Sequence, residues 1–314
     1  MNIGIDMMGG DYAPLEAVKG LQLFIEEIDS TTHIYCIGNE LQLNSLFTEF
    51  SISHSNIHIV PSTEVIGYNE HPTKALKEKP QSSIAIGFQL LANQTIDAFI
   101  SAGNTGAMLI GAMFTLKPID GIIRPTIATL MPKLNGGNGL LLDVGLNADC
   151  KPEQLNQFAI LGSLYAQQIL KIKSPKIGLV NVGEEESKGN ILAQSAFPIL
   201  KNNSHINFIG NIEGRDLFND KADVMVCDGF TGNIILKMAE SFYNIALQRN
   251  FAEDNFIKKF HYENYGGTPI LGVAKPVIIG HGISTAIAFK NMIEQAKDLI
   301  HSNFCTTIQH KFAS

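Results

Sequence analysis

Short runs of apolar residues alternate with longer segments in which apolar residues recur every three or four positions. The runs are typical of buried strands, and they cover 2–6, 33–37, 57–60, 96–100, 126–131, 139–144, 176–182, 206–209, 223–228, 271–273 and 277–279. The periodic segments predict helices at about 14–29, 39–47, 72–79, 82–93, 108–114, 152–170, 190–201, 233–250 and 283–303. This alternation predicts an α/β fold with a mostly parallel sheet and helices on both faces.

Two departures from simple alternation add detail. The sequence Asn135-Gly136-Gly137-Asn138 lies between two apolar runs, which is a hairpin signal, so part of the sheet is expected to be antiparallel. A polar segment at about 241–265 reads as helical on both sides of 252–255. It is either an arm that leaves the main body or an ordinary surface helix pair. No linker interrupts the chain, so we expect a single α/β domain, 1–314, with this excursion.

Five strand ends share one chemistry, a polar residue next to glycine. They are Asp6 before Gly9 and Gly10, the turn from Ser101 to Gly106, Asp143 with Asn147 close behind, Asn181 before Gly183, and Asp228 before Gly229. One such end is usually plain turn chemistry. Ligands of parallel α/β sheets bind beyond the carboxyl ends of the strands. Five polar ends therefore predict a ligand site there.

The turn Ser101-Ala102-Gly103-Asn104-Thr105-Gly106 joins a buried strand directly to a buried helix. Its glycines allow close backbone approach, and Asn104 or Thr105 can cap the helix. Free N–H groups at a helix start favour an anion. The alternative is a tight turn whose own Asn or Thr satisfies those groups.

Cationic candidates for an anionic ligand are few. Lys188 follows three consecutive glutamates, 184–186, which are placed either to position its ammonium or to form a solvated loop. Gly232 and Asn233 lie at the start of a long predicted helix and form a second possible anion nest. His281 lies between two glycines before the last predicted helix, where it is either a cap, a packing residue or an accessible base.

Composition limits the possible functions. Hydrophobic residues make up 45% and charged residues 17% of the 314 residues, and the net charge is −7. These are ordinary values for a globular enzyme, and the acidic balance argues against a nucleic-acid partner. The four cysteines, 36, 150, 227 and 305, form no C-x-x-C pair, so we expect reduced thiols and no metal site or cofactor.

The sequence also suggests a location for the protein. The chain opens with a strand rather than a signal peptide, and no apolar run approaches the length of a membrane span. We therefore expect a cytoplasmic protein for which any membrane contact must be peripheral. There is no G-x-S-x-G nucleophile motif and no G-x-G-x-x-G fingerprint. From the residues alone we expect an α/β enzyme that binds a phosphate-containing ligand.

Together these stretches resemble the PlsX family of bacterial phosphate acyltransferases. The resemblance covers essentially the whole chain in order, and it is carried by the runs 5–11, 101–107, 142–153, 181–190, 210–216, 227–233 and 265–273. It implies a three-layer α/β/α fold like those of isopropylmalate dehydrogenases and phosphotransacetylases. It also implies a homodimer, peripheral membrane association, and transfer of a long-chain acyl group from acyl carrier protein to inorganic phosphate at the start of phospholipid synthesis.

The resemblance to this family implies a role for each candidate residue. Catalysis is expected from Lys188, Asn147 and Asp228. Phosphate is expected to be bound by Ser101, Gly103, Asn104, Thr105, Gly106, Gly232 and Asn233, with the rest of the pocket from Asp6, Gly9, Gly10, Asp143, Asn181 and His281. Phosphate attacks the thioester directly, so no acyl-enzyme is required. A downstream glycerol-3-phosphate acyltransferase is a further expected partner.

The family usually has a longer helical excursion, often basic and apolar at its tip. Here 250–265 is short and offers only Lys258, Lys259 and His261 as positive groups. Lysines near an anionic surface contribute roughly 1 kcal/mol each, so membrane contact is expected to be weak. Lysines for the acidic carrier protein are expected at 74, 77 and 79, or at 258 and 259.

The acyl chain needs an apolar groove, for which Met108, Met113 and Phe114 are candidates, with plain core packing as the alternative. Two other functions remain open. A nicotinamide-dependent dehydrogenase would need a dinucleotide fingerprint, and a docking module without catalysis would leave the strand-end residues without a purpose.

Overall fold

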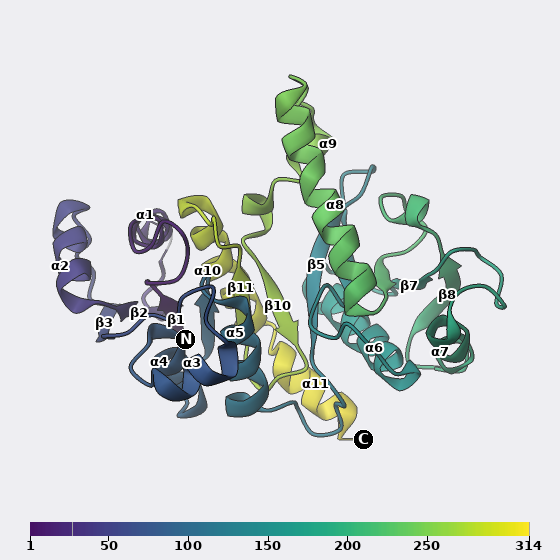
Figure 1. Ribbon diagram of the computed structural model, residues 1–314, viewed down its shortest axis with the longest axis horizontal. Helices are drawn as coiled ribbons and strands as arrows, with labels where there is room; N and C mark the ends of the chain where they lie inside the picture. Colours follow the sequence, from purple (N-terminus) through teal and green to yellow (C-terminus); the bar gives the residue numbers. More distant parts are fainter. Residues whose placement is uncertain (27, 314) are drawn as a thin grey trace. The chain divides into compact units, whose positions relative to one another are not determined.

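The computed structural model describes residues 1–26 and 28–313. Contacts between residues divide the chain into two compact units (Figure 1). Unit 1 comprises Met1–Ile119 and Tyr262–Thr306, and unit 2 comprises Asp120–His261 with 307–313. Each unit has its own set of paired strands. The expected organisation as a single domain, 1–314, stays a prediction.

The sheet of unit 1 has the order β3-β2-β1-β4-β11-β10. Its strands are β1 (Asn2–Asp6), β2 (His33–Gly38), β3 (Ile57–Pro61), β4 (Ala98–Ser101), β10 (Gly267–Leu271) and β11 (Val277–Gly280). β10 runs antiparallel to β11, whereas β1 pairs in parallel with β2 and β4, β2 with β3, and β4 with β11. The carboxyl ends of β1, β4 and β11 therefore lie at one edge.

Helices cover both faces of this sheet. They are α1 (Leu15–Ile25), α2 (Glu40–Glu49), α3 (Pro72–Glu78), α4 (Ser83–Ala92), α5 (Thr105–Gly111), the π-helix η1 (Ala112–Leu116), the 3-10 turn η3 (Tyr262–Tyr265) and α10 (Ala286–His301). In Figure 1, α1 and α10 lie on one side of the strands and α3, α4 and α5 on the other. The core is a cluster of buried aliphatic and aromatic side chains that includes Phe88, Phe99 and Met108.

The sheet of unit 2 has the order β5-β6-β9-β7-β8. Its strands are β5 (Thr126–Pro132), β6 (Asn138–Leu142), β7 (Lys176–Val180), β8 (Asn207–Ile212) and β9 (Val224–Val226). β5 and β6 form the predicted antiparallel hairpin, and the other pairs are parallel. The helical elements are α6 (Pro152–Gln168), α7 (Ile191–Lys201), the 3-10 turn η2 (Gly214–Asp216), α8 (Gly229–Gln248) and α9 (Asn255–Lys258).

The predicted excursion consists of the end of α8, then α9 and η3. Figure 1 shows the end of α8 and α9 extending away from the strands of unit 2. Within unit 2, the rings of Phe242 on α8 and Phe218 both pack against Phe260, with ring centroids 5.3 and 5.4 Å away. Phe256 of α9 packs on the same ring at 5.1 Å. An aromatic cluster therefore holds this segment in place.

The fold class is confirmed, and several element boundaries differ from the expectation. The last predicted helix ends at His301, where Asn303 adopts a left-handed conformation with φ 51°, and a further helix, α11 (Phe304–Phe312), follows. β10 covers Gly267–Leu271 and not 271–273. The sequence did not indicate this strand because proline, here Pro269, argues against one. β7 stops at Val180, two residues early. Among the described residues, no helix is both long and apolar enough to cross a membrane.

Candidate active site

In unit 1 the ends of β1 and β4 are joined by a buried hydrogen-bond network. Ser101 Oγ donates to Asp6 Oδ2 at 2.7 Å and accepts from the Gly103 N–H at 2.9 Å. Burial raises the pKa of Asp6, and hydrogen bonds from Ser101 and from the N–H groups of Met8 and Gly9 act in the opposite direction. A Cβ on Gly9 would lie 2.5 Å from Asp6 Oδ2. These predicted pocket residues are therefore brought together, and Asp6 and Ser101 hold the backbone of both turns.

Asn104 caps α5, as its residue type predicts. Its Oδ1 accepts from the Ala107 N–H at 2.9 Å, and its Nδ2 donates to the carbonyl oxygen of Gly67 at 2.9 Å. The Asn104 side chain is buried, and both its oxygen and its nitrogen have hydrogen-bond partners. The N–H groups of Thr105 and Gly106 donate to no acceptor among the described residues. The donors of this turn that have no acceptor among the described residues are therefore backbone groups.

Gly10 and His281 lie in neighbouring loops of unit 1. Gly10 has φ 111°, and its position faces the carbonyl oxygen of Gly282. The His281 ring lies 5.3 Å from the ring of Tyr262, whose hydroxyl donates to the Ile283 carbonyl at 2.7 Å. His281 Nδ1 accepts from the Ile283 N–H at 3.4 Å. His281 therefore both packs on an aromatic ring and accepts a local hydrogen bond, and its role in the pocket stays a prediction.

In unit 2, Asp143 and Asn147 form one buried unit at the end of β6. Asp143 Oδ2 accepts from the N–H of Asn147 at 2.8 Å and from its Nδ2 at 2.6 Å, while Asp143 Oδ1 accepts from the Gly145 and Leu146 N–H groups at 3.1 Å each. Asn147 Nδ2 also donates to the Pro125 carbonyl at 2.9 Å. Burial raises the pKa of Asp143, which these bonds oppose. The hydrogen bonds of Asp143 and Asn147 therefore fix this loop and tie it to Pro125.

The same loop contacts the start of α8. The Asn147 carbonyl accepts from the Gly229 N–H at 2.7 Å. Asp228 caps the helix, because its Oδ1 accepts from the Thr231 N–H at 2.8 Å and its Oδ2 from the Thr231 hydroxyl at 2.9 Å. The Gly232 N–H donates to the Asp228 carbonyl at 3.0 Å. The Gly232 N–H therefore already has an acceptor, and the role of Gly232 in phosphate binding stays a prediction.

Two positions near the start of α8 remain open to a ligand. Asn233 is exposed, and its side chain faces Gly145, which has φ 134°. The N–H of Phe230 donates to no acceptor among the described residues. Within unit 2, Asp143, Asn147, Asp228 and the start of α8 thus lie together, whereas the convergence of all five strand ends stays a prediction.

Lys188 lies in the loop that follows β7, here called the 183–190 loop. Asn181 Nδ2 donates to the Lys188 carbonyl at 3.1 Å, which closes the loop. Gly189, with φ 95°, is required because a Cβ there would lie 2.2 Å from Asn181 Oδ1. The Lys188 side chain is exposed, and its ammonium has no ion-pair partner within the described part of the chain.

Two of the three glutamates before Lys188 pair with other lysines and not with its ammonium, contrary to one of the two interpretations of the sequence. Glu184 Oε1 pairs with Lys221 Nζ at 2.6 Å, and Glu186 pairs with Lys201. The Glu185 carbonyl accepts from Asn211 Nδ2 at 2.9 Å.

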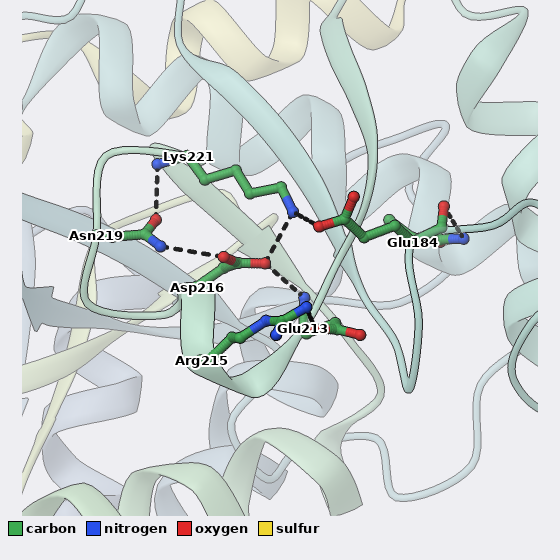
Figure 2. Close-up of polar contacts among 7 residues, drawn as sticks. Glu184, Glu213, Arg215, Asp216, Asn219 and Lys221 are labelled. Atoms are coloured by element: carbon green, nitrogen blue, oxygen red, sulfur yellow. Dashed lines mark hydrogen bonds and ion pairs between the residues drawn. The ribbon is translucent and has the colours of Figure 1, made fainter.

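Figure 2 shows a polar cluster that sequence reasoning missed. The Lys221 ammonium lies between Glu184 of the 183–190 loop and Asp216, whose Oδ2 is 2.9 Å away. Asp216 also accepts from the Glu213 N–H and from Asn219 Nδ2, both at 3.0 Å. Burial would raise the pKa of Asp216, but these hydrogen bonds outweigh it and lower the pKa to about 2. The only sequence signal was the run 210–216, without any indication of its partners.

The remaining candidates have mixed outcomes. Met108 is buried in the core, as its alternative interpretation predicts, whereas Phe114 is 68% exposed. Lys79 pairs with Glu70 at 2.6 Å, and Lys258 with Glu253 at 2.6 Å. The four cysteines are free. Across residues 1–26 and 28–313, no group of three His, Cys, Asp or Glu side chains is arranged to hold a metal ion.

The fold defines the class of protein first. It is similar to that of a phosphotransacetylase from Streptococcus pyogenes, with a TM-score of 0.69, 18% identity, and 96% of this chain and 94% of that chain covered. A branched-chain phosphotransacylase from Enterococcus faecalis V583 gives a TM-score of 0.64 at 14% identity, with 96% and 99% covered. At these identities the likeness establishes a phosphotransacetylase-like α/β fold.

Sequence similarity then gives the family. The model of a family described as "Fatty acid synthesis protein" matches residues 1–256 and 245–307. A phosphate acyltransferase from Thermoanaerobacterium thermosaccharolyticum is 44% identical, over 99% of this chain and 96% of the relative. A phosphate acyltransferase from Dictyoglomus thermophilum is also 44% identical, over 96% and 94%. The chain belongs to this family, and its resemblance to phosphate acyltransferases is confirmed.

Proposed function

We propose that this protein transfers a fatty acyl group from a thioester to inorganic phosphate and so forms an acyl phosphate for phospholipid synthesis. The observation that carries the proposal is the similarity to proteins named phosphate acyltransferase, which spans 99% of the chain at 44% identity. The absence of a G-x-S-x-G motif agrees with a reaction that needs no covalent acyl-enzyme.

Two groups of donors are candidates for the phosphate, one in each unit. In unit 1 they are the N–H groups of Thr105 and Gly106, which have no acceptor among the described residues. In unit 2 they are the Lys188 ammonium, also unpaired there, and the exposed Asn233 side chain. A charge-assisted hydrogen bond from lysine to phosphate is about twice as strong as a neutral one. Lys188 is therefore the candidate catalytic residue that we test first.

The other predicted residues act through these donors. Asp6 and Ser101 hold the turns before α5, and Asn104 caps that helix. Asp143, Asn147 and Asp228 fix the loop that ends at the start of α8. We assign them as positioning residues. Their side chains order the backbone to which a ligand binds.

The reaction balances without a further reactant. A phosphate oxygen attacks the thioester carbon and forms the C–O bond, the carbonyl oxygen becomes an oxyanion, and collapse of that intermediate breaks the C–S bond. The thiolate leaves with the electron pair and gains the proton that the hydrogen phosphate loses. Holding phosphate next to the thioester lowers the barrier by about 7–11 kcal/mol when the geometry is right, and donors at the oxyanion lower it further.

Acyl carrier protein is our proposed acyl donor. Its acidic surface needs a basic partner, and α3 offers the exposed Lys74 and Lys77. Lys74 lies 3.9 Å from Glu78, so its charge is only weakly compensated. Exposed charge pairs between partners raise the association rate and are screened by salt. We expect the Lys77→Glu variant to raise the KM for acyl carrier protein and to leave the KM for phosphate unchanged; no change in either would reject this docking site.

A homodimer and weak contact with the inner face of the membrane are also part of the proposal. Exposed apolar side chains on α8, namely Phe230, Ile234, Met238 and Ile245, form a helical stripe that supports a protein partner. Two of the basic residues expected to contact the membrane already have partners within the protein. Lys258 pairs with Glu253, and Lys259 donates to the Gly136 carbonyl. The acyl phosphate is then a substrate for an acyltransferase that acts on glycerol 3-phosphate.

Thiol release from palmitoyl-acyl carrier protein, followed with and without phosphate and with hydroxylamine present, tests the proposed activity. We expect release to require phosphate and to be accompanied by palmitoyl hydroxamate. Release without phosphate would identify a thioesterase instead. Absence of release with both the carrier protein and coenzyme A thioesters would reject acyl transfer.

A further inference from the structure

We propose that Lys221 is a positioning residue for phosphate binding, because it holds the Glu184 carboxylate away from the Lys188 ammonium. This inference rests on the proposed function, in which Lys188 binds phosphate. Lys221 Nζ lies 2.6 Å from Glu184 Oε1 and 2.9 Å from Asp216 Oδ2, and it links the 183–190 loop to the segment after β8 (Figure 2).

Several hydrogen bonds fix the Asp216 side chain, which is one of the two partners of Lys221. The Asp216 side chain is 9% exposed and accepts hydrogen bonds from the Glu213 N–H and Asn219 Nδ2. Asn219 Oδ1 in turn accepts from the Lys221 N–H at 2.8 Å. The Lys221 side chain, 30% exposed, is therefore fixed at both ends, whereas the Glu184 side chain is 58% exposed and depends on Lys221 for its place.

The 183–190 loop is tied mostly by donors from other elements. Asn211 Nδ2 donates to the Glu185 carbonyl at 2.9 Å, and Gln194 Nε2 donates to the Ser187 carbonyl at 2.9 Å. These bonds hold the backbone whether or not Lys221 is present. Loss of Lys221 would therefore free a side chain, Glu184, more than it would loosen the loop.

We expect a freed Glu184 carboxylate to turn toward the Lys188 ammonium. The position of a Cβ on Gly183 lies 3.1 Å from Lys188 Cγ, so the stem of Lys188 runs beside the residue that precedes Glu184. In this structure the Lys188 ammonium has no ion-pair partner among the described residues. A pair with Glu184 would compete directly with phosphate for that ammonium.

The test measures the KM for phosphate and kcat with palmitoyl-acyl carrier protein, for four variants and a control. We expect Lys221→Met to raise the KM about fivefold, the scale of one exposed ion pair, with kcat within about twofold of the wild type. Glu184→Gln should leave the KM unchanged or lower it. The double variant Lys221→Met/Glu184→Gln should regain the KM of Glu184→Gln, and Lys221→Arg should behave as the wild type.

The control is Lys19→Met. Lys19 forms a similar pair with Glu16 at 2.7 Å, with a side chain 38% exposed, and lies in unit 1. Its KM for phosphate should equal that of the wild type. If Lys221→Met lacks a cooperative melting transition, Lys221→Gln takes its place, since it keeps a donor for Asp216 without the charge.

Three results would overturn the inference. One is an unchanged KM in a folded Lys221→Met variant. The second is a Glu184→Gln variant as impaired as Lys221→Met, with no rescue in the double variant, because the pair would then have only a structural role. The third is a wild-type protein that forms no acyl phosphate, which rejects the proposed function and this inference with it. In the first two cases the wild type is active, so the two failures are distinguishable.

Discussion

The carbonyl oxygen of Asp143 lies 1.8 Å from the position that a Cβ would occupy on Gly232. The end of β6 and the first turn of α8 are therefore in direct backbone contact. No side chain fits between them, so the sequence requires glycine here for packing, independently of any ligand.

The Gly232→Ala substitution should destabilise the protein. Overpacking of a closed site typically costs about 1–3 kcal/mol, and the atom in the way is backbone, which cannot rotate aside. Chemical denaturation of the variant measures the loss. Gly214→Ala is the control, because no atom lies within 4 Å of its Cβ position; equal stability of the two variants would contradict the predicted contact.

The Lys188→Ala substitution should impair phosphate binding while the fold stays intact. Loss of a charge-assisted bond of about 1.5–3 kcal/mol raises the KM for phosphate roughly ten- to a hundredfold. The side chain is exposed and forms no ion pair within the described residues, so the free energy of unfolding should change by less than about 0.5 kcal/mol. Steady-state kinetics and urea denaturation measure both quantities. A KM equal to that of the wild type would remove Lys188 from the mechanism.

The Asn147→Ala substitution should act through stability. It removes the Nδ2 group that donates to Asp143 Oδ2 and to the Pro125 carbonyl, and it leaves both acceptors buried. Each lost partner of a buried polar group costs about 1–3 kcal/mol. We expect a lower urea midpoint together with lower activity. Full stability with no activity would instead place Asn147 in contact with the substrate.

Stability should depend on pH through Asp216. Its pKa in the folded protein, about 2, lies below the ordinary value of 3.8, so the charged carboxylate stabilises the fold. This contribution, about 2 kcal/mol, is complete above about pH 4 and is lost as the pH falls toward 2. Comparing urea denaturation of the wild type and Asp216→Asn at pH 7 and pH 2.5 measures it. The difference in unfolding free energy should shrink at pH 2.5, and a constant difference would refute the assignment.

Strand ends were predictable from the sequence because their signal is local. A buried apolar run followed by Asp6 or Asp228 and then glycine marks both the strand and its turn within a few residues. The spacing of Asp143 and Asn147 likewise predicted their proximity, although their mutual hydrogen bonds, which occupy both side chains, appear only in the structure.

Signals that depend on distant residues were missed. Glu184 and Lys221 lie far apart in the chain, and nothing in the local sequence pairs them; the neighbouring glutamates suggested Lys188 as the partner instead. Asn303 interrupts the last helix because asparagine tolerates the left-handed region, but a single Asn in a helical pattern is not a distinctive stop signal. Pro269 lies in a strand whose place is set by pairing with β11.

The most direct test of acyl transfer to phosphate is the stoichiometry of a single reaction. Phosphorus NMR would quantify acyl phosphate while a thiol reagent quantifies the free carrier protein, in the presence of excess inorganic phosphate. We expect one acyl phosphate for each thiol released and no release in the absence of phosphate. Thiol release accompanied by free fatty acid, without acyl phosphate, would contradict it.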